Sequence, residues 1–592
     1  MAVEAVSRRA SRSWSVARNP RPRQDLLRLR VLWLMVTVVF LATAVWGRLV
    51  YWQVIEHGSL SAEADAQHLT QIPLTPTRGM IYDRGGQPLA VNSTVYDVTL
   101  APDMVPAQAR RHVADSLAAV VGVQAGQVMK LLTSGHKFAY VAKRQPKSVR
   151  DRLVNLQLQG VSLQPQENRT YLPGGAPDLS LASSLLGFVD YQGQGARGIE
   201  QHYQPQLAGR AGYDSIYRDL LGRELTLGPD KRVEPVNGSN LTLSIDSNIQ
   251  FAAEQAIADG VKTNKAQGGS VIVMDPATGG IVAYASYPGY NANQFTTVDP
   301  ARTQDPIASG TYEPGSVMKV VTLSGALDAG RITPQTIIND PGYMDVTGSR
   351  IRDWDGANKG NISMTRVLEE SYNVGAIKAE QMEGRDSYFH YLQAFGFGQP
   401  SGIDVAGEAN VRLRPLDQWR ESEVATAAFG QGVAVNMVQM ATALNAVVND
   451  GALVQPHLVE RVGATPVRLA APRQVIKPET AAEMNQMMRS VVQHGSGWTA
   501  RIPGFELDEG GKTGTAQIPE GGRYSSDHVW ASYFGFLPAQ NPRFTMLVML
   551  NRPNNGSWDH NEGYYCAAPI WKRIAQQIIL DWRITPEALP PV

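Results

Sequence analysis

The sequence predicts an α+β protein with a single transmembrane helix at its N-terminus. A basic tail precedes an uncharged apolar run, a region of short strands and turns follows, and strand-like segments then flank a largely helical stretch. With 592 residues, 43% of them hydrophobic, the chain is long enough for several domains, each with its own core. We expect a basic tail over 1–30, a transmembrane helix over 31–50, a mixed pedestal domain over 51–240 and a larger C-terminal domain over 241–592.

The N-terminal pattern predicts an uncleaved membrane anchor. Residues 31–47 carry no charge, and a helix rising ~1.5 Å per residue would cover roughly 26 Å of a hydrocarbon core ~30 Å thick. Eight arginines precede this run, which by the positive-inside rule places the tail in the cytoplasm and the rest of the chain outside it. A cleaved signal peptide with its site at Ala42-Thr43-Ala44 is the alternative, but the apolar run continues past Ala44.

The composition of the chain argues against several other classes of function. The chain has 54 basic and 54 acidic residues, and zero net charge gives no support to a nucleic-acid binder. Cys566 is the only cysteine, so no disulfide can form within the chain. The metal-like group Asp559, His560, Glu562 and Cys566 has a spacing that matches no common site, so we expect a solvated loop, no metal and no cofactor.

The C-terminal domain begins and ends with strand signals. Strand-like runs occupy 269–274, 281–286, 530–536 and 543–550. The first two flank a turn sequence, which predicts a hairpin. Helices begin near Ile249 and near Ile570, so one helix precedes the early strands and another follows the late ones. The helical middle, about 305–500, would supply a nucleophile.

Ser316 and Lys319 are the candidate nucleophile and base. The residues after Pro314-Gly315 are apolar nearly all round up to Gly330, which predicts a buried helix. A spacing of three places the Ser316 hydroxyl and the Lys319 amine on one face, and burial favours the neutral amine that can accept a proton. This pair can activate a serine without a histidine.

Two downstream motifs complete an acyl-transfer site. Ser371 can pass a proton, and Asn373 can hold a substrate amide. A strand with Lys512, Thr513 and Thr515 offers a cation and two hydroxyls to a substrate carboxylate, and Gly514 permits close approach of a substrate backbone. A second Ser-x-x-Lys, Ser134 to Lys137, contains Gly135 and lies in no apolar run, so we interpret it as a chance match.

The ordered trio Ser-x-x-Lys, Ser-x-Asn and Lys-Thr-Gly resembles the signature of penicillin-binding proteins and class A β-lactamases. Residues 78–86, 169–173 and 198–200 resemble the pedestal of class B penicillin-binding proteins, and 241–246 resembles the entry into their transpeptidase domain. The resemblance covers most of the chain beyond about residue 50. It implies the penicillin-binding transpeptidase fold, in which early and late strands share one antiparallel sheet with the strand around Lys512. The first and last helices would cover this sheet, so that helices sandwich it, and a helical subdomain would lie beside it.

The pedestal motifs contain charged residues that we expect to be structural. Arg78, Arg84 and Arg169 with Asp83 and Glu200 would make a satisfied ionic cluster.

Three positions depart from the family pattern. Gly85 stands where asparagine is usual, Val317-Met318 where Thr-Phe is common, and Tyr372 where serine is common. The last two lie in or beside the site, so they leave substrate and drug preference open while the chemistry is retained.

The resemblance also implies the reaction and its partners. The substrate would be a peptidoglycan stem peptide ending in D-Ala-D-Ala, β-lactams would inhibit, and the backbone N–H groups of Ser316 and Thr515 would form the oxyanion hole. Family members work beside a glycan polymerase of the SEDS type and other division or elongation proteins of the bacterial inner membrane. Ser371-Tyr372-Asn373 followed by Val-Gly favours the division-specific branch. An elongation-type transpeptidase, a D,D-carboxypeptidase, a β-lactamase and a non-catalytic sensor or scaffold remain as alternatives.

Overall fold

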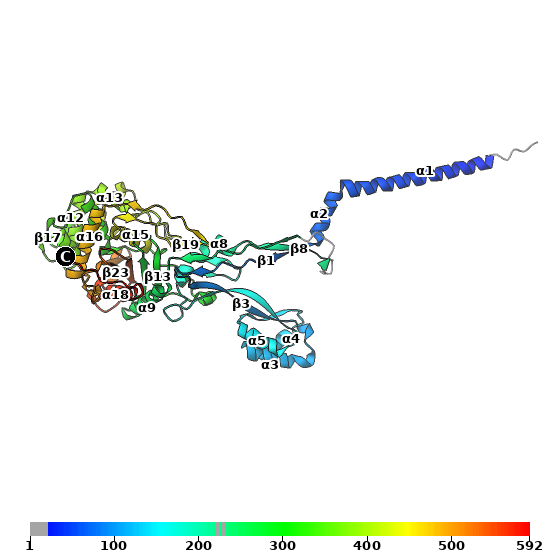
Figure 1. Ribbon diagram of the computed structural model, residues 1–592, viewed down its shortest axis with the longest axis horizontal. Coiled ribbons are helices and arrows are strands. Elements are labelled where there is room, and N and C mark those ends of the chain that lie inside the picture. The colour runs from blue at the N-terminus through cyan, green and yellow to red at the C-terminus, as the bar shows by residue number, and fades with distance from the viewer. Residues whose placement is uncertain (1–21, 219–223, 226–230) are drawn as a thin grey trace, which may run out of the picture. The chain divides into compact units, whose positions relative to one another are not determined.

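The computed structural model describes residues 22–218, 224–225 and 231–592 (Figure 1). The predicted basic tail before residue 22 lies outside the described residues. The chain divides into two compact units: Met1–Thr75 with Ala211–Pro235, and Pro76–Arg210 with Val236–Val592.

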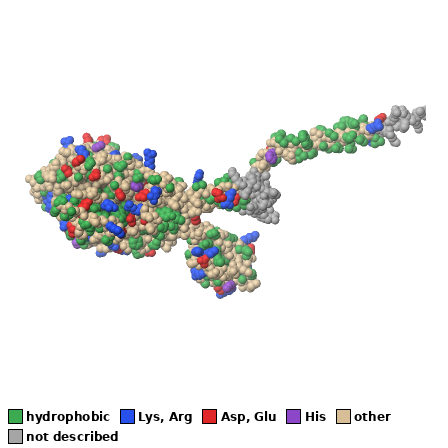
Figure 2. Space-filling model, in the orientation of Figure 1, with side chains coloured by type: hydrophobic (Ala, Val, Ile, Leu, Met, Phe, Trp, Pro, Cys, Tyr) green, Lys and Arg blue, Asp and Glu red, His purple; other side chains and the backbone are tan. Residues whose placement is uncertain are grey.

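The first unit contains the apolar helix. Helix α1 spans Pro22–Val50, a short π-helix continues it over Tyr51–Ile55, and α2 follows at His57–His68. The stretch Asp25–Ile55 is long and apolar enough to cross a membrane, and none of its most apolar window is buried against protein. Hydrophobic side chains cover the visible surface of this helix (Figure 2). The predicted span 31–50 lies inside it, which fits a single-pass anchor.

A small antiparallel sheet completes this unit. Its strands are β1 Leu69–Leu74, β8 Gly212–Arg218, β9 Glu224–Leu225 and β10 Lys231–Val233. The central strand β8 pairs with each of the other three.

The second unit is built on a five-stranded antiparallel sheet in the order β13-β12-β24-β23-β22. The strands are β12 Gly268–Met274, β13 Ile281–Tyr287, β22 Gly510–Glu520, β23 Arg523–Leu537 and β24 Phe544–Asn551. The predicted hairpin and the sharing of one sheet by early and late strands are both confirmed. Strand β22 lies at the edge of the sheet, so one side of its backbone has no neighbouring strand.

The first and last helices cover one face of this sheet, as predicted. Ile249 and Ile257 of α9 (Ser247–Thr263) and Trp571 and Ile574 of α18 (Ala568–Trp582) pack with Val271 and the other inward residues of the strands. Asp246 caps α9, since its side chain accepts from the backbone N–H groups of Asn248 and Ile249.

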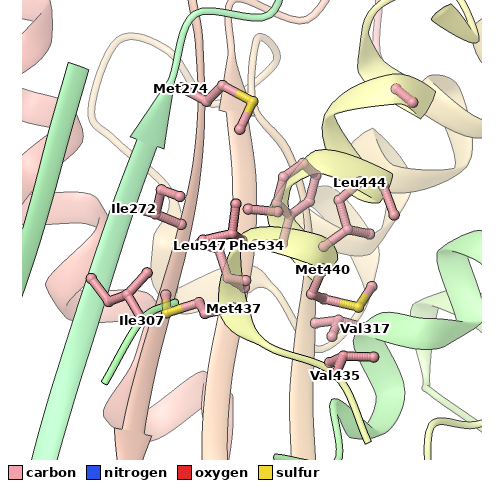
Figure 3. Close-up of a cluster of buried hydrophobic side chains, with 14 of the residues drawn as sticks. Ile272, Met274, Ile307, Val317, Val435, Met437, Met440, Leu444, Phe534 and Leu547 are labelled. Atoms are coloured by element: carbon pink, nitrogen blue, oxygen red, sulfur yellow. The ribbon is translucent and has the colours of Figure 1, made fainter. Parts of the chain in front are cut away.

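The opposite face of the sheet packs against the helical middle (Figure 3). Ile272 and Leu547 from the strands meet Met437, Met440 and Leu444 from α15, Met437–Val448. Val317, the neighbour of Ser316, is buried in the same cluster. The nucleophile segment is therefore fixed by the largest hydrophobic core of the described residues.

The helical middle consists of seven α-helices and three small two-stranded sheets. The helices are α10 Met318–Asp328, α11 Met364–Glu369, α12 Asn373–Glu383, α13 Arg385–Ala394, α14 Glu421–Ala427, α15 and α16 Pro478–His494. The small sheets pair β14 Ile337–Asp340 with β17 Gly360–Ser363, β15 Tyr343–Val346 with β16 Ser349–Arg352, and β18 Ala452–Leu453 with β21 Arg473–Gln474. A four-residue helix, α17 Gly563–Cys566, follows the last strand of the five-stranded sheet.

A second, mixed sheet belongs to the pedestal. Its strands are β2 Ile81–Tyr82, β3 Pro88–Leu100, β4 Ala139–Gln145, β5 Val161–Tyr171, β11 Leu241–Leu243, β19 Val459–Val462 and β20 Thr465–Pro466. Helices α3 Arg110–Val121, α4 Ala125–Leu132 and α5 Lys147–Leu156 gather at one end of β3 around a small core of their own (Figure 1). Because β19 and β20 come from far downstream, this sheet joins the pedestal to the C-terminal domain.

The remaining short elements surround the buried Glu200. They are α6 Ser183–Leu186, β6 Phe188–Val189, β7 Gly195–Ala196, α7 Gly198–His202 and α8 Gln204–Ala208. Glu200 of α7 is fully buried and forms ion pairs with Arg78 at 2.6 Å and with Arg169 at 2.7 Å.

The predicted ionic cluster is only partly correct. Arg84 is exposed and lies 5.7 Å from the ring centroid of Trp582. Asp83 accepts hydrogen bonds from the backbone N–H groups of Gly85 and Gln87 and from the Ser247 hydroxyl. Asp83 therefore stabilises a turn and the start of α9, whereas Arg84 lies over Trp582 of α18, and within the described residues neither forms an ion pair with Glu200.

Glu200→Gln is expected to destabilise the second unit by about 3–5 kcal/mol, because it leaves two buried guanidinium groups without a counter-charge. A marked fall in the thermal unfolding midpoint would show this. Asp259→Asn is the matched control, since Asp259 pairs with Arg573 on the surface and should hardly change that midpoint. Equal midpoints for the two variants would contradict a structural role of the cluster.

Candidate active site

All three sequence motifs line one cleft of about 830 Å³. Ser316 comes from the segment before α10, Ser371 and Asn373 from the connection between α11 and α12, and Thr513 and Thr515 from the edge strand β22. Segments far apart in the sequence therefore meet at one site.

Ser316 lies in a short 3-10 helix, Gly315–Val317, that leads directly into α10. Gly315 has a φ of +63° and its N–H donates to the carbonyl of Gly430 at 3.0 Å. A Cβ at position 315 would come within 2.8 Å of the Thr515 carbonyl oxygen, so only glycine lets the serine segment approach β22 this closely. The backbones of Ser316 and Thr515 are neighbours for this reason.

Lys319 is fully buried. Its Nζ donates to the carbonyl oxygen of Ser371, lies 2.9 Å from Asn373 Oδ1 and lies 3.3 Å from Ser371 Oγ. The hydrogen bonds of the amine thus connect the first motif to the second. Burial, followed by the nearby Lys512 cation, lowers the pKa of Lys319 well below its usual range.

Ser371 occupies an uncommon backbone conformation, with a φ of +61° between α11 and α12. This turn brings its carbonyl and its hydroxyl toward the two lysines. Ser363 caps α11 by accepting from the N–H of Arg366. Asn373 is the first residue of α12, and its Nδ2 donates to the carbonyl of Arg352 at 2.9 Å.

Lys512 reaches the same serine from the sheet. It is fully buried, and its Nζ lies 2.9 Å from Ser371 Oγ and 2.9 Å from the Thr513 carbonyl oxygen. Burial lowers the pKa of Lys512 to about 7. Two lysines of reduced basicity therefore flank one hydroxyl, an arrangement that can relay a proton.

The residues of β22 divide between the two faces of the strand. Thr513 and Thr515 line the cleft. Gly514 has the opposite orientation: a Cβ there would lie 2.3 Å from Ser532 Oγ and 3.1 Å from a methyl of Val317. The missing side chain thus lets the strand pack on the nucleophile segment, while a backbone approaching the free edge of β22 remains sterically possible.

Other residues that line the cleft belong to none of the three motifs. Ser496 lies 2.9 Å from the Thr513 hydroxyl, and Thr515 Oγ1 accepts from the N–H of Gly563. Further lining residues are Trp354, Glu370, His494, Trp498, Trp558 and Glu562. They lie in loops and at helix ends without periodic patterns, and of them the sequence singles out only Glu562, as part of a loop with no predicted role.

Two further candidate groups from the sequence are the second Ser-x-x-Lys and the metal-like group that contains Cys566. Ser134 follows α4 in the pedestal, where its hydroxyl donates to the carbonyl of Leu131. The Cys566 thiol is buried and contacts the carbonyl of His560. Within the described ranges, no three His, Cys, Asp or Glu side chains are grouped to hold a metal ion.

Comparison with known families agrees with this geometry. Residues 269–576 match the family described as Penicillin binding protein transpeptidase domain, and residues 73–243 match Penicillin-binding Protein dimerisation domain. Stage V sporulation protein D of Bacillus subtilis is 30% identical over 95% of this chain and 87% of the relative. Peptidoglycan D,D-transpeptidase FtsI of Escherichia coli is 29% identical over 92% of this chain and 90% of the relative.

Solved structures give the same result. Penicillin-binding protein 3 of Mycobacterium tuberculosis in complex with aztreonam superposes with a TM-score of 0.67 at 25% identity, covering 88% of this chain and 99% of that chain. The fold, the order of the two domains and the order of the three motifs in the cleft thus all agree with these relatives. The chain belongs to the class B penicillin-binding proteins, in which a dimerisation domain precedes a transpeptidase domain.

Proposed function

We propose that this chain is a serine-type peptidoglycan D,D-transpeptidase. The observation that carries the proposal is the meeting of Lys319 and Lys512 at Ser371, in the cleft that Ser316 lines. The relatives of this chain include proteins named as peptidoglycan D,D-transpeptidases, which supports the reaction class.

The first half-reaction forms an acyl-enzyme. Ser316 Oγ attacks the carbonyl of the penultimate D-Ala, and Lys319, whose pKa is lowered by burial, takes the hydroxyl proton. Backbone N–H groups of Ser316 and Thr515 stabilise the oxyanion. The C–N bond then breaks, and the terminal D-Ala leaves as an amine that receives a proton through Ser371.

The second half-reaction forms the cross-link. An acceptor amine on another stem peptide attacks the acyl carbonyl, an amide forms, and the Ser316 oxygen regains a proton. Asn373 holds a substrate amide, and Thr513, Thr515 and Lys512 bind the terminal carboxylate of the donor. A backbone laid along the free edge of β22, where Gly514 lies, would gain strand-like hydrogen bonds. β-Lactams would acylate Ser316 in the same way, and the reaction would stop at the acyl-enzyme.

Added acceptor amine is expected to divert product from free acid to cross-linked peptide, because a transferase protects its acyl-enzyme from water until an amine arrives. Mass spectrometry of products from a defined stem peptide, with and without acceptor, measures this ratio. A product that stays free acid at every acceptor concentration would favour the D,D-carboxypeptidase alternative.

The role of this chain in the cell is also part of the proposal. Similarity to FtsI is consistent with septal synthesis, with an elongation role as the alternative. We place the basic tail, residues 1–30, in the cytoplasm and the anchor, residues 31–50, in the inner membrane. The pedestal, residues 51–240, and the transpeptidase domain, residues 241–592, would lie on the extracytoplasmic side. The eight arginines before the anchor support this orientation.

We also propose that the anchor and the pedestal dock on a SEDS-type glycan polymerase. Small residues Ala42, Thr43, Ala44 and Gly47 are exposed near one end of the helix, and small residues let transmembrane helices approach closely. Exchange of residues 31–50 for an unrelated transmembrane helix should leave β-lactam labelling intact but weaken co-purification with the polymerase. Undiminished co-purification would mean that the helix only anchors the chain in the membrane and does not contribute to docking.

A further inference from the structure

Two buried aspartates, Asp340 and Asp353, lie beside the second motif. Asp340 ends strand β14 and is 0% exposed, and Asp353 follows β16 and is 4% exposed. We propose that their carboxyl groups share one proton, that the pair positions Asn373, and that its charge controls how readily Lys319 acts as a base. The inference rests on the proposed function, since it takes Lys319 as the base.

Asp353 holds the start of α12. Its Oδ1 accepts from the backbone N–H of Asn373 at 2.6 Å and from that of Val374 at 3.0 Å. The residue at the usual capping position, Tyr372, makes no side-chain hydrogen bond to the helix. Asp353 therefore replaces the cap, and the position of Asn373 depends on it.

The remaining oxygens of the pair indicate the shared proton. Asp340 Oδ1 accepts from the N–H of Gly342 at 2.8 Å. The Oδ2 atoms of Asp340 and Asp353 are both buried without a hydrogen-bond partner among the described residues. Gly342 connects the two aspartates, because its N–H donates to the Asp340 side chain and its carbonyl accepts from the N–H of Asp353 at 3.0 Å, so the two carboxyl groups lie close together. A proton held between the two Oδ2 atoms satisfies both and avoids two adjacent buried charges.

The charged groups around the pair are few. Lys319 of α10 interacts electrostatically with both aspartates, and Lys512 of β22 lies beyond it. Lys378 of α12 donates to the carbonyl of Asn339, and Lys359 pairs with Asp355 and lies over the Tyr372 ring. Arg352 precedes Asp353 in the chain. Neither aspartate forms an ion pair with any of these cations in the part of the chain that the structure describes.

The pair links the charge of Lys319 to pH. Burial, reinforced by the neighbouring Asp353, raises the pKa of Asp340 to about 6. Below that pH Asp340 is mostly protonated. As pH rises through it, Asp340 loses its proton, and the new negative charge beside Lys319 favours the ammonium form of that lysine. The pair therefore opposes the loss of the Lys319 proton in the neutral range.

Asp340→Asn tests this directly. Its amide can donate to Asp353 Oδ2 and still accept from Gly342, but it cannot ionise. We expect the acylation rate of Ser316 by a labelled β-lactam to begin its rise with pH about one unit lower than in the wild type, a usual size for the effect of one nearby charge. Asp340→Ala, which removes the donor, should lower the rate about 10- to 100-fold through misplacement of Asn373.

The exposed Asp345, paired with Arg350 in the neighbouring hairpin, supplies the matched control. Asp345→Asn should keep both the rate and the pH profile of the wild type. A wild-type pH profile in Asp340→Asn would overturn the inference, and so would a folded Asp340→Ala with a wild-type rate. Should Asp340→Ala fail to fold, the pH profile of Asp340→Asn still decides. Absence of Ser316 labelling in the wild type would instead overturn the proposed function, and this inference with it.

Discussion

Replacing Ser316 with alanine is expected to abolish covalent labelling by a β-lactam, because the acyl bond forms on its Oγ. Ser316 lines the cleft and its flanking residues Gly315 and Val317 are buried, so the loss of one hydroxyl should leave the fold unchanged. Mass spectrometry of peptides from the labelled full-length protein would locate the adduct.

The second Ser-x-x-Lys supplies the control. Ser134 is exposed on the pedestal and its hydroxyl donates to a backbone carbonyl, so Ser134→Ala should be labelled like the wild type. An adduct on Ser134, or persistent labelling of Ser316→Ala, would remove Ser316 from the role of nucleophile.

Replacing Lys319 with arginine is expected to slow acylation by about 10²- to 10⁴-fold, the usual contribution of a general base. Arginine keeps the positive charge but does not become a neutral base near neutral pH. The rate of β-lactam acylation under single-turnover conditions measures the effect. Lys137→Arg, on the exposed second motif, should keep the wild-type rate.

The wild-type rate should also depend on pH in a defined direction. Burial and Lys512 lower the pKa of Lys319, so the amine is protonated and inactive below that lowered value and becomes a base above it. Acylation should rise with pH through this value, and the rise should be absent in Lys319→Arg. A normal rate in that variant would exclude Lys319 as the base.

Local sequence patterns were sufficient to predict many elements. The predicted hairpin corresponds to β12 and β13, and the runs near residues 530 and 543 correspond to β23 and β24. Alternation, turn residues and caps act over a few residues, so they can be recognised without knowledge of the fold. The order of the three motifs likewise pointed to acyl transfer.

Residue pairings across the chain were beyond the reach of these patterns. Asp83 and Arg84 were expected beside Glu200, yet each has other partners. The hydrogen bonds of Lys319 go to Ser371 and Asn373, partners that the spacing of Ser316 and Lys319 could not indicate. Orientation depends on the backbone between motifs, such as the positive φ of Ser371, which no local propensity indicates.

The sequence by itself determined the anchor, the class of secondary structure along the chain and the residue types of an acyl-transfer site, because each is encoded in short-range spacing of apolar, polar and turn residues. Only the tertiary structure decided that Lys319 and Lys512 converge on Ser371, that Gly514 faces the nucleophile segment, and that Asp340 and Asp353 lie together behind Asn373. The reason is physical: desolvation and the sharing of protons depend on which groups meet in the core, and those groups are separated in this chain by 13 to 197 residues.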